Sequence, residues 1–363
     1  MPFHRLLRQA AGIACICLFG GSTALAAGAG KPPRQFESRL FTRVADVALG
    51  PAAGRIDYQS IDPDAKRLYV SMMGAGRLLV FDTERNRVLK RLEGFPRVTG
   101  VLVVPELHRV YASVPGAGLG PSVAVGLGML GLSAGTGAVV VVDANTLQEV
   151  ARLPGGVFPD GLAFDAPDRR LFVSDELGSA VLVIDTDANR FLTRVAAGGE
   201  VGNVQYESMN SKLYAPVQSK NELAIFDPRK NTRIGFYPLP GCEHPHGLAL
   251  APDAAIGYVA CDGNDVLLSV DLSSGAVLGR YPAGHDPDVL AVDRELKRLY
   301  VAGESGVLST FNIANPAVPE ALGDTFAGPN AHSVAVDASS HRLYLPIADL
   351  NGFSVMRELA PKR

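Results

Sequence analysis

The sequence predicts an all-β fold, a seven-bladed β-propeller made of four-stranded antiparallel blades. Three observations predict it: a strand-like phrase returns seven times, its spacing is nearly constant, and further short strands with polar turns surround each copy. The copies are RLYVSM at 67, RVYASV at 109, RLFVSD at 170, KLYAPV at 212, IGYVAC at 256, RLYVAG at 298 and RLYLPI at 342.

The spacing of the repeats is typical of propeller blades. The aromatic residue of each phrase follows the previous one by 42, 61, 42, 44, 42 and 44 residues. Periods of about 40–50 residues are typical of four-stranded blades. Seven repeats that span most of the 363 residues leave no room for a second core, so we expect one domain over 39–358. The aromatic residues are Tyr69, Tyr111, Phe172, Tyr214, Tyr258, Tyr300 and Tyr344.

One repeat, residues 160–197, shows how a blade is built. DGLAFD, RLFVSD, AVLVID and FLTRVAA are four strand-like segments with polar turns between them. Small and large residues alternate in the first segment, which is the period-two signature of a strand. The third strand repeatedly ends in an acid, where a carboxylate can accept hydrogen bonds from turn N–H groups. These structural acids are Asp82, Asp143, Asp185, Asp227 and Asp271.

The last repeat lacks its fourth strand. The segment TRVADVAL at 42 resembles LTRVAA, the fourth strand of the third blade. We therefore expect an N-terminal strand to complete the last blade and close the ring, which hides strand edges. Residues 359–363 are then a C-terminal tail.

The N-terminus has the pattern of a secretory signal peptide. Arg5 and Arg8 precede an apolar run that is too short for a membrane span, and Ala24-Leu25-Ala26 fits a cleavage site. We therefore expect a signal peptide at 1–26, a flexible segment at 27–38, and a periplasmic or secreted protein with no membrane span after cleavage. Cys242 and Cys261 remain, and in an oxidising compartment they can form a disulfide. The alternative is metal ligation beside His244.

The repeated L-Y-V-x phrase and the V-x-D turn make the chain resemble the YVTN or YncE-like seven-bladed β-propellers of exported bacterial proteins. The resemblance covers residues of about 40–357. It implies the propeller fold and says little about chemistry, because such propellers carry many unrelated functions.

Aligning the repeats on their aromatic residues defines two polar rings at the mouth of the central channel. The first ring, at the start of each blade's first strand, is Asp57, Thr99, Asp160, Gly202, His246, Asp288 and His332. The second ring, two positions earlier, is Arg55, Arg97, Phe158, Glu200, His244, Asp286 and Asn330. Three of the chain's seven histidines lie on these rings, which favours a functional centre over scattered surface polarity.

Imidazole and carboxylate groups together suit a divalent zinc, manganese or iron ion better than calcium. We expect metal ligands among His244, His246, Asp288, His332 and Asp57, with His246, His332 and Asp288 as the catalytic residues. A bound ion would polarise a carbonyl or a water molecule. The predicted substrate-binding residues are Arg55, Arg97, Asp160, Glu200, Asp286 and Asn330. Two alternatives stay open: metal-free acid/base catalysis, and a solvated channel entrance built from ordinary turn residues.

The second repeat contains an extra segment, residues 115–137, rich in glycine and apolar residues. Its place between the second and third strands puts it on the face of the proposed mouth, as a lid, an inert loop or a docking patch for another protein. The sequence therefore predicts an exported propeller that binds a small polar or anionic ligand, as a metal-dependent lactonase-like hydrolase or lyase. The alternative is a non-catalytic module of the cell envelope that engages a partner through its rim and this insertion. With 34 basic and 37 acidic residues, no nucleic-acid partner is expected.

Overall fold

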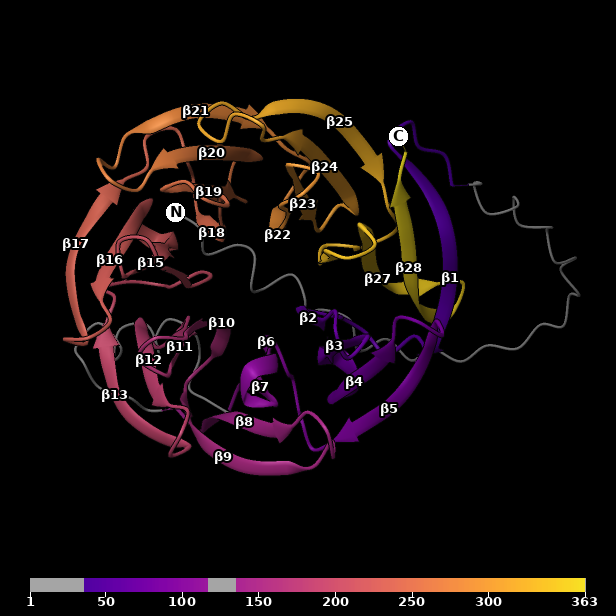
Figure 1. The fold of residues 1–363 in the computed structure, drawn as a ribbon, viewed down its shortest axis with the longest axis horizontal. Coiled ribbons are helices and arrows are strands. Elements are labelled where there is room, and N and C mark those ends of the chain that lie inside the picture. Colours follow the sequence, from indigo (N-terminus) through magenta and orange to yellow (C-terminus); the bar gives the residue numbers. More distant parts are fainter. Residues whose placement is uncertain (1–35, 117–134, 363) are drawn as a thin grey trace, which may run out of the picture. The chain divides into compact units, whose positions relative to one another are not determined.

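A computed structural model describes residues 36–116 and 135–362. They form seven four-stranded antiparallel sheets arranged as a ring, which is the predicted seven-bladed propeller (Figure 1). In the part of the chain that the structure describes, no helix has the length and hydrophobicity needed to cross a membrane.

The first three blades follow the sequence in order. Blade 1 is β2 (Gln59–Asp62), β3 (Arg67–Met72), β4 (Arg77–Asp82) and β5 (Arg87–Glu93). Blade 2 is β6 (Val101–Val104), β7 (Arg109–Val114), β8 (Gly137–Asp143) and β9 (Glu149–Gly156). Blade 3 is β10 (Pro159–Asp165), β11 (Arg170–Asp175), β12 (Ala180–Asp185) and β13 (Arg190–Ala196). Short 3-10 turns lie at Met73–Ala75, Pro105–Leu107 and Gln218–Lys220.

The next three blades repeat the plan. Blade 4 is β14 (Gln205–Glu207), β15 (Lys212–Val217), β16 (Glu222–Asp227) and β17 (Thr232–Pro238). Blade 5 is β18 (Pro245–Leu250), β19 (Ile256–Cys261), β20 (Val266–Asp271) and β21 (Val277–Pro282). Blade 6 is β22 (Pro287–Asp293), β23 (Arg298–Gly303), β24 (Val307–Asn312) and β25 (Glu320–Phe326).

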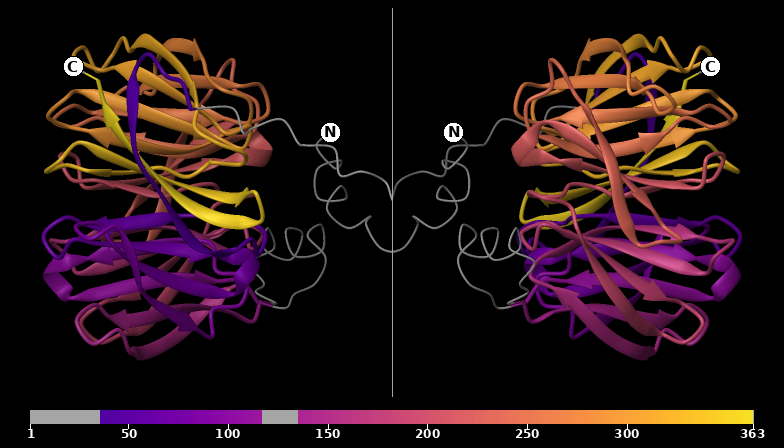
Figure 2. Two further views of the ribbon diagram at one scale, coloured as in Figure 1. Left: turned by 90° about the vertical axis from the view of Figure 1, so that its right-hand side faces the viewer. Right: turned by 90° about the vertical axis from the view of Figure 1, so that its left-hand side faces the viewer.

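Blade 7 combines the two ends of the described chain. Its strands are β26 (Ala335–Asp337), β27 (Arg342–Leu350), β28 (Phe353–Pro361) and, at the outer edge, β1 (Phe41–Pro51). Phe41 pairs with Pro361 and Pro51 with Phe353, so β1 runs antiparallel to β28 along its whole length. Figure 2 shows β1 in indigo beside the yellow C-terminal strand. Because β28 continues to Pro361, residues 359–361 belong to the blade, where a tail was predicted.

The repeated aromatic residues form the packing between blades. All seven are at most 1% exposed. Tyr69 of blade 1 packs in one cluster with Val110 of blade 2, and Tyr258 of blade 5 packs with Leu299 of blade 6. Each aromatic ring therefore buries its large apolar surface against the next blade, which explains why the phrase recurs once per repeat.

The acids that end the third strands are structural, as predicted. Asp82 Oδ1 accepts hydrogen bonds from the N–H groups of Glu84 and Arg85 at 3.1 and 2.9 Å. Asp185 Oδ1 binds the N–H groups of Asp187 and Ala188 in the same way. These carboxylates hold the turn between the third and fourth strands.

Three sequence predictions lie wholly or partly outside the described residues. The signal peptide at 1–26 and almost all of the flexible segment at 27–38 precede Phe36. The central part of the insertion, 117–134, falls in the internal gap. Of the predicted flexible segment, Phe36 packs beneath Arg357, whose guanidinium carbon lies 5.2 Å from the ring centroid.

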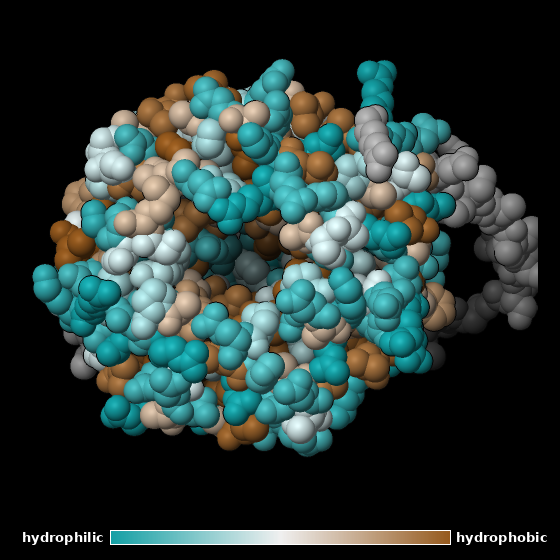
Figure 3. Space-filling model, viewed as in Figure 1, coloured by the Kyte–Doolittle hydropathy of each residue, from teal (hydrophilic) through white to brown (hydrophobic). Residues whose placement is uncertain are grey.

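The ring leaves a central hollow. In Figure 3, which shows the same face as Figure 1, hydrophilic residues predominate around this hollow. Side chains that border this hollow can therefore lie close together near the axis of the ring, even when their blades are not neighbours.

Candidate functional site

The first ring is held in place by a repeated backbone bond. The N–H groups of Asp57, Thr99 and Gly202 each donate to the carbonyl of a facing residue on the second strand of their blade, at 2.8, 3.0 and 2.9 Å. In blades 1, 2 and 4, the first-ring position therefore has the same backbone hydrogen bond. The structure brings five of the seven first-ring residues together in one network near the axis: Asp57, Asp160, His246, Asp288 and His332.

Asp57, Asp288 and His332 form the tightest group. One ligand atom from each lies within 4.8 Å of the others, so the three residues could hold a metal ion. His332 Nε2 lies 3.5 Å from Asp57 Oδ1 and 3.9 Å from Asp288 Oδ2. All three side chains are buried, and they come from blades 1, 6 and 7.

The orientation of His332 suits metal ligation through Nε2. Its Nδ1 lies 3.1 Å from the backbone oxygen of Asn330 and donates a hydrogen bond to it. In the neutral ring, Nε2 then has a lone pair that points toward Asp57 and Asp288. Metal-ligating histidines commonly donate their other N–H group to a backbone carbonyl in this way. Asn330, predicted to bind substrate, thus contributes its backbone oxygen to the site.

The guanidinium of Arg55, a second-ring residue, lies between Glu304 and the two aspartates of this group. Its Nη1 lies 2.5 Å from Glu304 Oε1, whereas its Nη2 lies 3.4 Å from Asp57 Oδ1 and 3.5 Å from Asp288 Oδ2. Strong charge-assisted hydrogen bonds measure about 2.7–2.9 Å. Glu304 is therefore the main partner of Arg55, and the two aspartates are only loosely paired with it.

His246 lies between two carboxylates. Its Nε2 is 3.6 Å from Asp160 Oδ2, and its Nδ1 is 3.8 Å from Asp288 Oδ1. The hydroxyl of Tyr58 lies 3.4 Å from the same Nε2 and donates a 2.8 Å hydrogen bond to Asn203 Oδ1. Tyr58 thus connects blade 1 with blades 4 and 5 across the axis.

The two aspartates of the tight group differ in their electrostatics. Burial acts to raise the pKa of Asp57, but Arg55 and His332 outweigh it and lower that pKa. Burial raises the pKa of Asp288, although His246 and other cations oppose the rise. Asp57 is therefore the carboxylate that is better stabilised in its charged form.

On the opposite side of the channel, the carboxyl groups of Asp160 and Glu176 have fewer positively charged neighbours to offset their burial. Burial raises the pKa of Asp160 well above its ordinary value, and Asp57 and Glu176 raise it further. Burial raises the pKa of Glu176 to about 7, even though Gln218 donates a 3.0 Å hydrogen bond to its Oε1. This side therefore has an excess of acid over cation.

Three buried atoms of the network have no hydrogen-bond partner within the described part of the chain: His332 Nε2, Asp288 Oδ1 and Asp160 Oδ2. Buried polar atoms without partners are rare in folded proteins, since each costs about 1–3 kcal/mol. All three are atoms that can ligate a cation. Their presence in one network marks a place where an ion, a polar ligand or water can supply the missing partners.

The structure disperses most of the second ring. The guanidinium of Arg97 stacks over Phe158, 5.6 Å from the ring centroid, and donates to the backbone oxygen of Gly116 at the base of the insertion. The insertion thus begins beside the mouth. Glu200 lies near Glu176, whose pKa it helps to raise.

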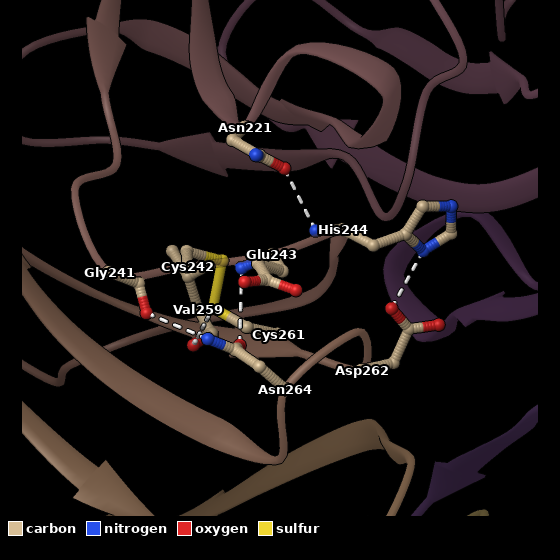
Figure 4. The surroundings of a disulfide bond; sticks show 9 residues. All are labelled: Asn221, Gly241, Cys242, Glu243, His244, Val259, Cys261, Asp262 and Asn264. Atoms are coloured by element: carbon tan, nitrogen blue, oxygen red, sulfur yellow. Dashed lines mark hydrogen bonds and ion pairs between the residues drawn. A yellow bond between two sulfur atoms is a disulfide. The ribbon is translucent and has the colours of Figure 1, made fainter. Parts of the chain in front are cut away.

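His244 and Asp286, also on the second ring, have other partners. His244 Nδ1 lies 2.7 Å from Asp262 Oδ1, so this predicted metal ligand pairs with Asp262 (Figure 4). Asp286 joins Asp265 and His285 in a second, more exposed group that could also hold a metal ion.

Cys242 and Cys261 are bonded to each other, with 5.4 Å between their Cα atoms (Figure 4). The disulfide prediction is confirmed, and the alternative of metal ligation by these cysteines is wrong because both sulfurs are in the bond. The bridge ties the segment before β18 to the end of β19 and lies two residues from His244.

Sequence reasoning missed the polar groups that complete the site. Four of these groups share one position, four residues after the repeated aromatic of their blade and directly after the second strand: Glu176, Gln218, Asp262 and Glu304. This position forms a third ring, which the same alignment of repeats would have revealed. Tyr58 and Asn203 were also missed, and each directly follows a first-ring position.

No protein-family model matches the sequence. A protein of Salmonella typhi described as uncharacterized protein YncE is 25% identical over 99 residues. This match covers 27% of the chain and 27% of the length of that relative. Together with the seven blades, it supports a resemblance to YncE-like propellers.

Three solved structures share the fold. A chain of the Kuenenia stuttgartiensis hydrazine synthase superposes with a TM-score of 0.68 at 15% identity, over 85% of this chain and 96% of that one. A chain of a mitotic checkpoint complex superposes with a TM-score of 0.71 at 13% identity, over 95% of this chain and 98% of that one. The RRP9 WD40 repeats superpose with a TM-score of 0.69 at 10% identity, over 87% of this chain and 100% of that one. At such low identities, these likenesses show the propeller fold alone.

Proposed function

We propose that this propeller binds one divalent transition-metal ion at the axis of its ring through Asp57, Asp288 and His332. The observation that carries the proposal is the convergence of three buried ligand atoms from three blades, one of which, His332 Nε2, lacks a hydrogen-bond partner. A lone pair facing two carboxylates is unfavourable. A proton on Nε2 or a metal ion removes the conflict, and a divalent ion can bind all three residues at once.

The ligand atoms are spaced as a small ion requires. A tetrahedral ion with bonds of about 2.1 Å places its ligand atoms about 3.4 Å apart. His332 Nε2 lies 3.5 and 3.9 Å from the two carboxylate oxygens, so small side-chain movements are sufficient. One nitrogen and two carboxylate oxygens favour zinc, manganese or iron over calcium, which takes more oxygen ligands.

We further propose that a small polar molecule binds beside the ion, and that the protein is a metal-dependent hydrolase or lyase of lactonase-like type. A bound ion would polarise a carbonyl group of the ligand. His246 lies beside Asp288 and within reach of Tyr58, and its 18% exposed side chain can exchange a proton with a ligand. Arg55 holds Glu304 and so stabilises the wall of the site.

The charges favour a neutral or cationic ligand over the anionic ligand first expected from Arg55 and Arg97. Arg55 is paired with Glu304, and Arg97 is stacked on Phe158. The acids around Asp160 exceed the cations near them. Export to the periplasm or the medium remains part of the proposal, supported by the N-terminal sequence pattern and by a disulfide, which is typical of oxidising compartments. A protein partner for the insertion stays a prediction, because 117–134 lie outside the described residues.

Metal content tests the proposal. We expect elemental analysis to find metal retained by the purified chain after loading with zinc or manganese and desalting. His332→Ala and Asp57→Asn should each retain at least one ion fewer than the wild type. His341→Ala is the matched control, because His341 also pairs with an aspartate, Asp293, away from the network. Turnover of a panel of small lactones should disappear on chelation. Equal metal retention by all three variants would contradict the assignment.

A further inference from the structure

We propose that the channel takes a second divalent ion beside the first, held by Asp160, His246 and the shared carboxylate of Asp288. This inference rests on the proposed function, since it adds a site to the one described above. The result is a two-metal centre bridged by Asp288.

Asp288 faces a different imidazole with each of its oxygens. Oδ2 lies 3.9 Å from His332 Nε2, and Oδ1 lies 3.8 Å from His246 Nδ1. Beyond the two imidazoles lie Asp57, 3.5 Å from His332, and Asp160, 3.6 Å from His246. Carboxylates and imidazoles thus alternate through the network, with Asp288 at its centre.

This arrangement supplies two ligand sets of the same residue types, of which the second is less compact. Asp57, Asp288 and His332 have ligand atoms within 4.8 Å of one another, whereas Asp160, His246 and Asp288 come together this closely only after a side-chain movement. Each ion would have one histidine, one terminal aspartate and one oxygen of Asp288. The two nitrogens of His246 face different carboxylates, so a turn of its ring is needed to direct one nitrogen to the ion. The ring is 18% exposed on the channel side, which leaves room for such a turn.

The atoms without partners fall on the second site as well as the first. Asp160 Oδ2 and Asp288 Oδ1, both buried, have no hydrogen-bond partner among the described residues, and both are ligand atoms of the proposed second ion. Asp160 is 3% exposed, so bulk water does not satisfy it. One ion at the first site would satisfy only His332 Nε2.

The positively charged residues near the second site are few. Arg55 pairs with Glu304, and among the described residues no lysine or arginine forms an ion pair with Asp160 or Glu176. A divalent ion beside Asp160 would supply the missing positive charge. Paired ions about 3.5–4 Å apart are a known arrangement for binding and activating ester and phosphate groups.

The test is the number of ions bound by the full chain. After removal of metal, the protein is titrated with manganese(II) alone, and bound metal is measured by calorimetry and by elemental analysis after desalting. We expect two ions per chain, one in Asp160→Asn, and none in Asp288→Asn. Electron paramagnetic resonance should show a spin-coupled manganese pair in the wild type and an isolated ion in Asp160→Asn.

Controls separate the possible outcomes. His285→Ala removes a ligand from the exposed Asp265, His285 and Asp286 group, and it should still bind two coupled ions. A fall to one ion in this variant would overturn the inference, and so would one ion in the wild type. No retained ion would refute the proposed function as well. If Asp160→Asn fails to fold, His246→Gln removes the other ligand that belongs to the second ion alone, and this variant should likewise bind one ion.

Discussion

Glu176 is the residue whose ionisation should be visible in stability. It is partly buried beside His246 and Glu200, and its pKa is about 7 against an ordinary value of 4.5. Between these two pH values the folded protein retains a proton that the unfolded chain releases. The folded state therefore binds more protons, and its stability falls as pH rises from about 4.5 to about 7.

Glu176→Gln removes this loss. We expect the variant and the wild type to have similar melting temperatures near pH 4. At pH 8 the variant should be more stable by about 2 kcal/mol, which corresponds to about 3 °C for a ring of this size. Thermal unfolding followed by circular dichroism at both pH values makes the measurement. Glu84→Gln, at an exposed turn position, is the control. An equal gap at both pH values would show that Glu176 does not titrate as described.

At the residue scale, the sequence identified the residues of the network but not the partners of their neighbours. Aligning the repeats correctly grouped Asp57, Asp160, His246, Asp288 and His332. It could not show that Arg55 would choose Glu304, because that choice depends on a side-chain torsion and on a residue in another blade. Nor could it show that His244 turns toward Asp262.

At the scale of the element, blade 5 has a covalent constraint next to the mouth. The disulfide closes a loop between positions 19 residues apart. It joins Cys242, three residues before Pro245 at the start of β18, to Cys261, which pairs with Pro245 and precedes Asp262. The bridge therefore restrains both partners of the His244 and Asp262 contact.

Cys242→Ala/Cys261→Ala should lower the free energy of unfolding by about 3 kcal/mol, the value that chain entropy gives for a loop of this length. Urea unfolding of the wild type and of the double variant measures this difference in free energy. Hydrogen exchange should increase mainly in residues 239–246 and 261–265, while blade 1 serves as an internal control. An unchanged unfolding midpoint would mean that the bridge does not stabilise the folded state relative to the unfolded chain.

At the scale of the whole ring, blade 7 joins segments from opposite ends of the described chain. Arg357 of β28 is 8% exposed and binds Asp46 of β1 through two hydrogen bonds of 2.7 Å each. Phe41 of β1 packs against Tyr300 of blade 6, with 6.0 Å between ring centroids. Strand β1 is thus attached to blade 7 by pairing and to blade 6 by packing.

Asp46→Ala should destabilise the ring by about 3 kcal/mol, because Arg357 is then a buried charge that has lost its carboxylate. Urea unfolding followed by fluorescence should show one transition at a lower midpoint, since every blade packs on its neighbours. Asp64→Ala, at an exposed turn position, should leave the midpoint unchanged. Two separate transitions in the Asp46 variant would indicate that the blades unfold independently.

The sequence by itself determined the number of blades, the order of strands and the turn acids. These depend on local properties: the alternation of small and large residues, the buried aromatic once per repeat, and a carboxylate beside its own turn. Only the tertiary structure decided which polar residues share the axis as partners and which of their atoms lack one. Those contacts join residues such as Asp57 and Asp288, which are distant in sequence and belong to different blades, and they depend on side-chain torsions that no repeat pattern records.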